Sequence, residues 1–226
     1  PSSVSSISYL LHLNDLQAIP SDKENSWREM ICDESWPMLA DQSLTSESLI
    51  SNHCKEIHSK STEELVTFEE SQNLEFKSSV WHPYEIPKNP NLTPSEITKA
   101  INQATIKTVS GFLNSDGGTL LIGLNDDNEI LGLNRDIKAS NIKDLDNYEL
   151  RLVKLLSDKC GRANIAEFVR VTFCYIEKEQ VCRLDVRPST TPVFTKDEKF
   201  YVRLGNATNS LYPSEIYDYC NRHWRA

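Results

Sequence analysis

The spacing of apolar positions changes several times after residue 66, and each change predicts a different element. Residues 67–80 alternate between apolar and charged positions, which is typical of a strand with one buried face. Thr93-Pro94-Ser95-Glu96 then opens a helix, because threonine is a good N-cap, proline suits the first turn and Glu96 completes a capping box. Apolar residues at helical spacing continue to Leu113, and the glycines of 114–118 predict the turn that ends this helix.

The rest of the pattern predicts a sheet with two further helices. Residues 119–124 form an unbroken apolar run, which indicates a strand buried on both faces. Further strands are predicted at 129–133, 166–176, 181–186, 192–194 and 200–204, and helices at 145–156 and from Pro213 to about Trp224. This order favours an α+β fold, a mixed sheet with helices packed on one side or at one end.

The N-terminal third is more acidic than the remainder of the chain. Residues 1–68 hold 11 acids and 4 bases, a net charge of −7, which leaves −2 of the total of −9 for the other residues. We divide the chain into an acidic, mostly helical appendage or linker at 1–66, including an amphipathic helix at 7–19, and a domain at 67–226. The appendage could pack on the domain or on a protein partner, or it could be a flexible linker. The near-neutral domain can present a basic rim, but we do not expect it to bind nucleic acid non-specifically with high affinity.

Cysteine usage and hydropathy indicate the compartment. The six cysteines include no Cys-x-x-Cys pair and no Cys/His cluster with zinc spacing, which favours a reducing, cytoplasmic environment. No apolar run approaches the roughly 20 residues that cross a bilayer, so we expect no membrane association. Neither nucleotide-binding glycine fingerprint occurs.

Candidate chemistry lies on the first strand and just after the buried one. Glu75 and Lys77 would share one face of the first strand, with Glu70 five residues before Glu75. If the two strands are neighbours, Asp126 joins these residues. Three carboxylates and a lysine in one place are the chemistry of a divalent-metal site that acts on phosphate. On spacing alone, solvated residues at a strand edge are the better interpretation of the two glutamates, and the third acid with Lys77 brings a metal site level with it.

Several motifs in the same order resemble the Schlafen family, in its AlbA-like core domain, which is also labelled a divergent AAA-type ATP-binding or putative DNA-binding domain. The resemblance covers about residues 69–224, as a single lobe, and is strongest to stand-alone prokaryotic members. The motifs are Glu70-Ser71, Glu75-Phe76-Lys77, the string from Phe112 to Gly123, Asn125-Asp126-Asp127, and the segments 130–133, 192–194 and 201–208.

The resemblance implies a metal-dependent endoribonuclease active in defence or stress response. Vertebrate Schlafen nucleases cut tRNA and rRNA with a carboxylate triad, and Glu70, Glu75 and Asp126 fall on its positions. These acids would bind Mg²⁺ or Mn²⁺, with Lys77 neutralising phosphate charge and Asp127 able to replace Asp126. Where those nucleases have a Cys-Cys pair of a zinc site, this chain has Thr190-Thr191, so no zinc is implied. They also have two lobes around a groove, so this single lobe would need a homodimer.

Other residues are weaker candidates. Arg203 could contact phosphate or pair with the acids, and Lys99 and Lys107, with Arg135, Lys138 and Arg187, could form a basic rim. The resemblance favours RNA over DNA as the partner. Trp81 and Tyr84 could stack on bases, although cover for the sheet is the better interpretation. Residues 114–118 follow a helix, so the negative end of the helix dipole points toward them and would repel a phosphate. A structural turn is therefore favoured over a phosphate cradle. Two alternatives to a nuclease stay open: a non-catalytic nucleic-acid or nucleotide-binding module, and a protein-interaction domain that uses residues 1–66.

Overall fold

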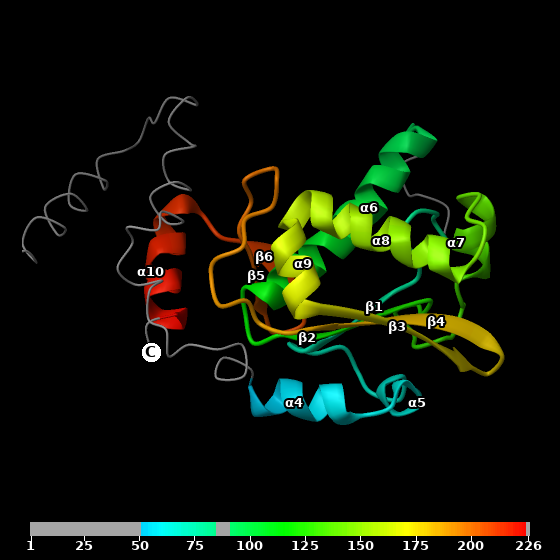
Figure 1. Ribbon diagram of the computed structural model, residues 1–226, viewed down its shortest axis with the longest axis horizontal. Coiled ribbons are helices and arrows are strands. Elements are labelled where there is room, and N and C mark those ends of the chain that lie inside the picture. Colours follow the sequence, from blue (N-terminus) through cyan, green and yellow to red (C-terminus); the bar gives the residue numbers. More distant parts are fainter. Residues whose placement is uncertain (1–50, 85–90, 225–226) are drawn as a thin grey trace, which may run out of the picture.

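The computed structural model describes residues 51–84 and 91–224. A four-stranded sheet lies at its centre, with β1 (Leu74–Lys77), β2 (Gly118–Ile122), β4 (Glu179–Val186) and β3 (Val169–Ile176) in that spatial order (Figure 1). β1 runs parallel to β2, while β4 is antiparallel to both β2 and β3. The mixed sheet confirms the α+β class predicted from the sequence.

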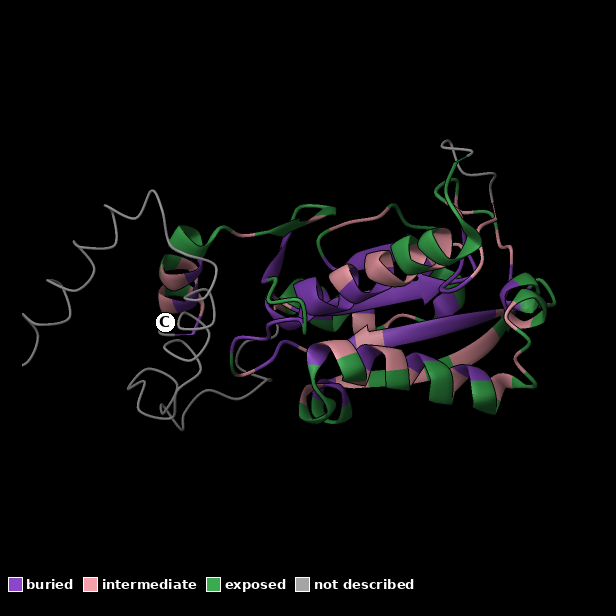
Figure 2. Ribbon diagram, turned by 90° about the horizontal axis from the view of Figure 1, so that it is seen from above, coloured by how far each residue is buried: buried purple, intermediate pink, exposed green. Residues whose placement is uncertain are grey.

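Helices cover one face of this sheet. α6 (Pro94–Leu113), α8 (Leu145–Cys160) and α9 (Arg162–Phe168) lie above it in Figure 1, with α7 (Asn134–Ala139) at its end. Figure 2 shows the buried residues on the strands and the inward sides of these helices. The largest core cluster includes Val109, Phe112, Leu120, Leu152 and Leu184. This burial of apolar area is the main favourable term in folding.

The opposite face is covered by α4 (Asn52–Ser59) and α5 (Thr62–Leu65), which come from the helical appendage predicted at 1–66. The helices α6, α8 and α9 of the domain itself lie on one face of the sheet, as predicted. Ile57, Leu65, Leu74, Phe76 and Leu121 form the core on the α4 side of the sheet. The division between appendage and domain at residue 66 remains a prediction.

A buried arginine fastens α4 to the sheet. Arg183 on β4 donates from Nη1 to Lys60 O (2.7 Å) and from Nη2 to His58 O (3.1 Å), carbonyls at the end of α4. The described part of the appendage therefore packs on its own domain, as one of the alternatives predicted. The helix predicted at 7–19 lies outside the described residues.

A third unit packs beside the main sheet. β5 (Tyr201–Leu204) and β6 (Ala207–Ser210) form an antiparallel hairpin that leads into α10 (Pro213–His223). Its core contains Phe194, Phe200, Val202, Ile216, Cys220 and Trp224. The hairpin contacts α6, and this packing brings Arg203 on β5 to the β1 region.

The helix boundaries predicted from capping chemistry are confirmed. Thr93 and Glu96 form the reciprocal capping box of α6, with Glu96 N donating to Thr93 Oγ1 (3.3 Å) and Thr93 N donating to Glu96 Oε2 (2.8 Å). α8 begins at Leu145 and α10 at Pro213, also as predicted. α8 continues four residues beyond the predicted end at residue 156, to Cys160.

Several predicted strands are shorter than expected or are not strands. The strand predicted at 67–80 is reduced to β1, because Ser71 N bonds to Leu74 O and turns the chain back. The strand predicted at 129–133 is only a Leu124–Ile130 bridge, and α7 follows it. Residues 166–168 end α9, and 192–194 form no strand. In each case tertiary packing overrides an apolar run too short to specify its own conformation.

Candidate functional site

The parallel pairing of β1 and β2 brings their C-terminal ends to one edge of the sheet. Lys77 pairs with Ile122 in register, and Gly123 N donates to Lys77 O (2.8 Å). The turn at 125–129 follows β2 at this edge. Asn128 Nδ2 donates to Phe68 O (2.8 Å), which fixes the turn against the segment that leads to Glu70. The sequence-predicted acids from these two separate segments are therefore brought together.

Glu70 lies along the outer edge of β1. Its Oε1 accepts a hydrogen bond from Phe76 N (2.7 Å). Partial burial raises the pKa of Glu70, and repulsion by Glu75 and Asp126 raises it further, although the Phe76 N–H bond and Lys77 oppose these effects. Glu70 thus lies within electrostatic reach of all three other predicted site residues.

Glu75 is buried and held between two cations. Its Oε1 contacts Lys77 Nζ, and its Oε2 accepts from Arg203 Nη1 (2.7 Å). Asp126, in contrast, is exposed and makes no hydrogen bond to the part of the chain that the structure describes. The three acids therefore have different environments: Glu75 is buried and ion-paired, Glu70 is half-buried, and Asp126 is exposed to solvent.

Arg203 is the centre of a buried polar network. Besides Glu75, its guanidinium donates to Ser71 O (2.6 Å), to Gln72 O (3.2 Å) and to Thr208 Oγ1 (2.9 Å). Its side chain is 0% exposed, so the salt-bridge alternative describes it and no surface is left for the predicted phosphate contact. Arg203 holds Glu75 and the turn before β1 in place from a different sheet.

The predicted metal ligands do not form a metal-binding set in this arrangement. Among residues 51–84 and 91–224, no group of three or more His, Cys, Asp or Glu residues could hold a metal ion. The physical reason is that both carboxylate oxygens of Glu75 are already bound to cations. A divalent cation could use Glu75 only after Lys77 leaves Oε1.

Two other predicted basic residues, Lys99 and Lys107, lie on α6. Lys99 is exposed on α6, and Lys107 Nζ lies 5.7 Å from the centre of the Tyr201 ring. Neither makes an ion pair with Glu70, Glu75 or Asp126 in the described structure. Their contacts with nucleic acid stay a prediction.

The 114–118 turn is structural. Asn114 is fully buried, and its Nδ2 donates to Val193 O (2.8 Å) and Tyr201 O (3.0 Å). Gly117 has a φ of +81°, and a Cβ there would lie 2.7 Å from Val186 O, so only glycine fits. These contacts support the turn interpretation over a phosphate cradle.

Sequence reasoning missed Asp136, which orders the segment leaving β1. Its carboxylate is fully buried and accepts from the backbone N–H groups of Val80 (2.8 Å), Trp81 (3.0 Å) and His82 (2.8 Å). Burial raises the pKa of Asp136, and the three N–H bonds oppose that rise. Trp81 is buried beside Tyr148, with ring centres 4.8 Å apart, so it covers the core and does not stack on bases.

An open hollow of about 640 Å³ lies over α7, next to the start of β4. It is lined by Tyr84, Leu131, Asn134, Arg135, Lys138, Ala139 and Glu179. Arg135 lies 4.9 Å from the centre of the Tyr84 ring, and the Tyr84 hydroxyl donates to Gly132 O (2.8 Å). The hollow therefore gathers an aromatic ring and two of the predicted basic-rim residues.

Comparison with known proteins identifies the class of this domain. Residues 70–211, more than half of the chain, match the family model described as "Schlafen, AlbA_2". The chain belongs to this family, and its domain is broadly a nucleic-acid-associated one.

A likeness to a solved structure is more distant. A crystal structure of the DIP2311 protein from Corynebacterium diphtheriae has a TM-score of 0.44 and 17% sequence identity, covering 67% of this chain and 27% of that chain. The chain thus spans about a quarter of that protein. Among the described residues, no helix has the length and apolar character to cross a membrane.

We expect Glu70→Gln to stabilise the protein slightly at neutral pH. The amide oxygen can still accept from Phe76 N, while burial and the repulsion by Glu75 and Asp126 no longer act on a charge. Because the pKa of Glu70 is raised in the folded state, its stabilising contribution is complete below the ordinary value of 4.5 and is lost as the pH rises through the folded pKa. The gain should stay below about 1 kcal/mol, because the group is partly solvated.

Urea unfolding of wild type and Glu70→Gln at pH 4 and pH 8 measures this gain in stability. The free energy of unfolding of the variant should exceed that of wild type by more at pH 8 than at pH 4. A variant that is less stable than wild type at pH 8 would contradict the described environment of Glu70.

Proposed function

We propose that this domain processes nucleic acid as an endoribonuclease that cleaves tRNA-like or other RNA in a defence or stress response. The observation that carries the proposal is the gathering of Glu70, Glu75, Asp126 and Lys77 at one edge of the sheet. The hollow over α7, with Tyr84, Arg135 and Lys138, offers stacking and cationic groups for a nucleic-acid strand. As the family likeness implies, a homodimer would supply a two-lobed groove.

The environments of the four residues suit different roles. The partial exposure of Glu70 and its hydrogen bond from Phe76 N suit a residue that orients the attacking group or completes the shell of a cation. Asp126 is the exposed acid that can approach the substrate. Lys77 is partly exposed and can neutralise phosphate charge. Glu75, which is bound to both Lys77 and Arg203, sets the position of the lysine.

The proposal includes dependence on Mg²⁺ or Mn²⁺, held by Glu70, Asp126 and Oε1 of Glu75. In the described arrangement these residues do not fit a cation, because Lys77 occupies Oε1. Transfer of Lys77 to a substrate phosphate is what would free that oxygen. We assign no chemical step to the metal.

A second candidate is a non-catalytic nucleic-acid-binding module. The observation in its favour is the pair of ion pairs from Lys77 and Arg203 to Glu75, which satisfies the carboxylate without any ligand. Such a module would need the hollow and its cations but not the acids, and it would bind RNA without divalent metal.

A panel of tRNA and single-stranded DNA, incubated with the full chain in Mg²⁺, in Mn²⁺ or in EDTA, separates the two functions. We expect endonucleolytic cutting of RNA that requires metal, with DNA cut less. Retention of RNA in a gel-shift assay with no cutting in any metal would favour the binding module and would contradict the nuclease.

A further inference from the structure

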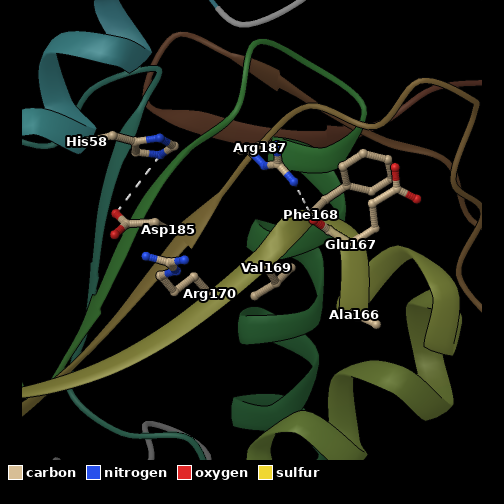
Figure 3. A pocket seen from close by; sticks show the side chains of 8 residues that line it. All are labelled: His58, Ala166, Glu167, Phe168, Val169, Arg170, Asp185 and Arg187. Carbon is tan, nitrogen blue, oxygen red and sulfur yellow. Dashed lines mark hydrogen bonds and ion pairs between the residues drawn. The ribbon is translucent and has the colours of Figure 1, made fainter. Parts of the chain in front are cut away.

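A second cavity lies at the opposite end of the sheet from the carboxylates. Its volume is about 520 Å³, within the range of small-molecule sites. It is lined by His58, Ala166, Glu167, Phe168, Val169, Arg170, Asp185 and Arg187 (Figure 3). His58 Nε2 lies 3.1 Å from Gly118 O, at the start of β2, whereas Asp126 follows the end of that strand. The length of β2, roughly 15 Å, separates the two places.

Three cationic or polar side chains come to this cavity from three different elements. His58 lies at the end of α4, Arg170 on β3, and Arg187 just beyond β4. Figure 3 shows their ring and guanidinium groups around the same space. Arg187 Nη2 donates to Glu167 O (2.6 Å), which fixes its guanidinium beside the Phe168 ring, 6.0 Å from the ring centre.

The acid on the inner wall is already neutralised. Asp185 accepts from Arg183 Nε at 2.9 Å through each oxygen, and its Oδ1 also accepts from Thr119 Oγ1 (2.6 Å). Arg170 is opposite Asp185 in the β3–β4 register, yet it forms no ion pair with it or with any other described residue. The exposed Arg170 guanidinium therefore lies at the mouth of the cavity without an ion pair. With Asp185 neutralised by Arg183, the lining holds two arginines, Arg170 and Arg187, against one acid, Glu167, which gives the cavity a positive character.

We propose that this cavity is a phosphate-binding site, distinct from the carboxylate site and independent of nuclease activity. Arg170 supplies the main contact, because a guanidinium matches two phosphate oxygens with parallel N–H donors. Arg187 and His58 flank the bound group, and the partly exposed Val169 provides apolar surface for an attached nucleoside. The ligand class is a phosphate ester, either a free nucleoside phosphate or a phosphodiester of an RNA strand.

Nuclear magnetic resonance titrations of the ¹⁵N-labelled full chain test the site with three probes. These are inorganic phosphate, uridine 5′-monophosphate and a six-residue oligouridylate, all in EDTA so that the metal proposal does not enter. We expect saturable shifts of the Arg170, Phe168 and Arg187 amide signals with at least one probe. Saturation by the mononucleotide identifies a nucleoside-phosphate site, and saturation by the oligonucleotide alone identifies a contact to an RNA strand.

Matched variants tie the binding to the cavity. Arg170→Ala should weaken the dissociation constant at least about tenfold, as expected for a lost charge-assisted hydrogen bond. Arg170→Lys should recover only part of it, and Arg162→Ala, an exposed arginine on α9 outside the lining, should leave it within twofold. No saturable shift with any probe, or equal affinity of wild type and a folded Arg170→Ala, would overturn the proposal.

Discussion

Replacing Arg203 by alanine is expected to lower the free energy of unfolding by about 3–5 kcal/mol, which is a large share of the stability of a domain this size. The arginine is fully buried and bonds to the Glu75 carboxylate and to two backbone carbonyls of the turn before β1. Without it, Glu75 is left buried with only Lys77 as a counter-charge, and the carbonyls of Ser71 and Gln72 lose their donors. An unpaired buried charge costs more than the pair contributes.

Urea unfolding followed by circular dichroism measures this effect. Arg203→Lys should fall between alanine and wild type, because it keeps the charge but cannot form the forked set of bonds. Lys107→Ala is the control, since it removes a cation from the same region that only lies over the Tyr201 ring. An Arg203→Ala protein within 1 kcal/mol of wild type would show that the buried network does not hold β1 in place.

The sequence predicted those elements whose conformation depends only on residues close together in the chain. The Thr93–Glu96 capping box needs only neighbouring residues, and the helix that it opens begins where the sequence predicts. The buried run that became β2 was also recognisable, because all its residues are apolar or small. Short segments such as 129–133 and 192–194 could not be assigned, because their conformation depends on what packs against them.

The packing of α4 and α5 on the sheet could not be predicted either, because it too depends on distant residues. α4 and α5 pack on the sheet through Ile57 and Leu65, and Arg183 from β4 binds the carbonyls at the end of α4. The Arg183 bonds join residues more than 100 positions apart, and no pattern within the polar 51–66 segment indicates either set of contacts. The His58 cavity escaped prediction for the same reason.

The candidate site was only partly predictable. The sequence indicated which acids share an edge, and the environment of Glu70 supports that convergence. It could not indicate that Arg203 and Lys77 would both bind Glu75, because Arg203 reaches β1 from another sheet. Asp136 resembled any helical surface acid, yet three backbone N–H groups converge on it.

Asp126→Asn is expected to reduce RNA cleavage by at least about a hundredfold while leaving stability unchanged. The loss is that of a carboxylate from the reaction centre, a change that typically costs two to four orders of magnitude. Stability should not change, because Asp126 is exposed and forms no hydrogen bond within the described structure. It is therefore a cleaner probe than Glu75, whose removal would also leave Arg203 and Lys77 without their carboxylate partner.

Asp127→Asn is the matched control. Asp127 is the adjacent residue on the same turn and is equally exposed, and only its backbone N–H bonds within the turn, to Asn125 Oδ1 (3.1 Å). Both substitutions remove one negative charge from the same place, so they change the attraction for RNA equally. A difference in cleavage between them therefore reports the chemistry of Asp126 and not the charge of the turn.

The most direct test of the reaction centre is the single-turnover rate of tRNA cleavage in Mn²⁺ by wild type, Asp126→Asn and Asp127→Asn, with the melting temperature of each protein measured in parallel. The account predicts cleavage by wild type, a rate within about threefold of it for Asp127→Asn, and at least a hundredfold loss for Asp126→Asn at an unchanged melting temperature. Equal rates for the two variants, or no cleavage by a folded wild type, would contradict the assignment of these carboxylates as a nuclease centre.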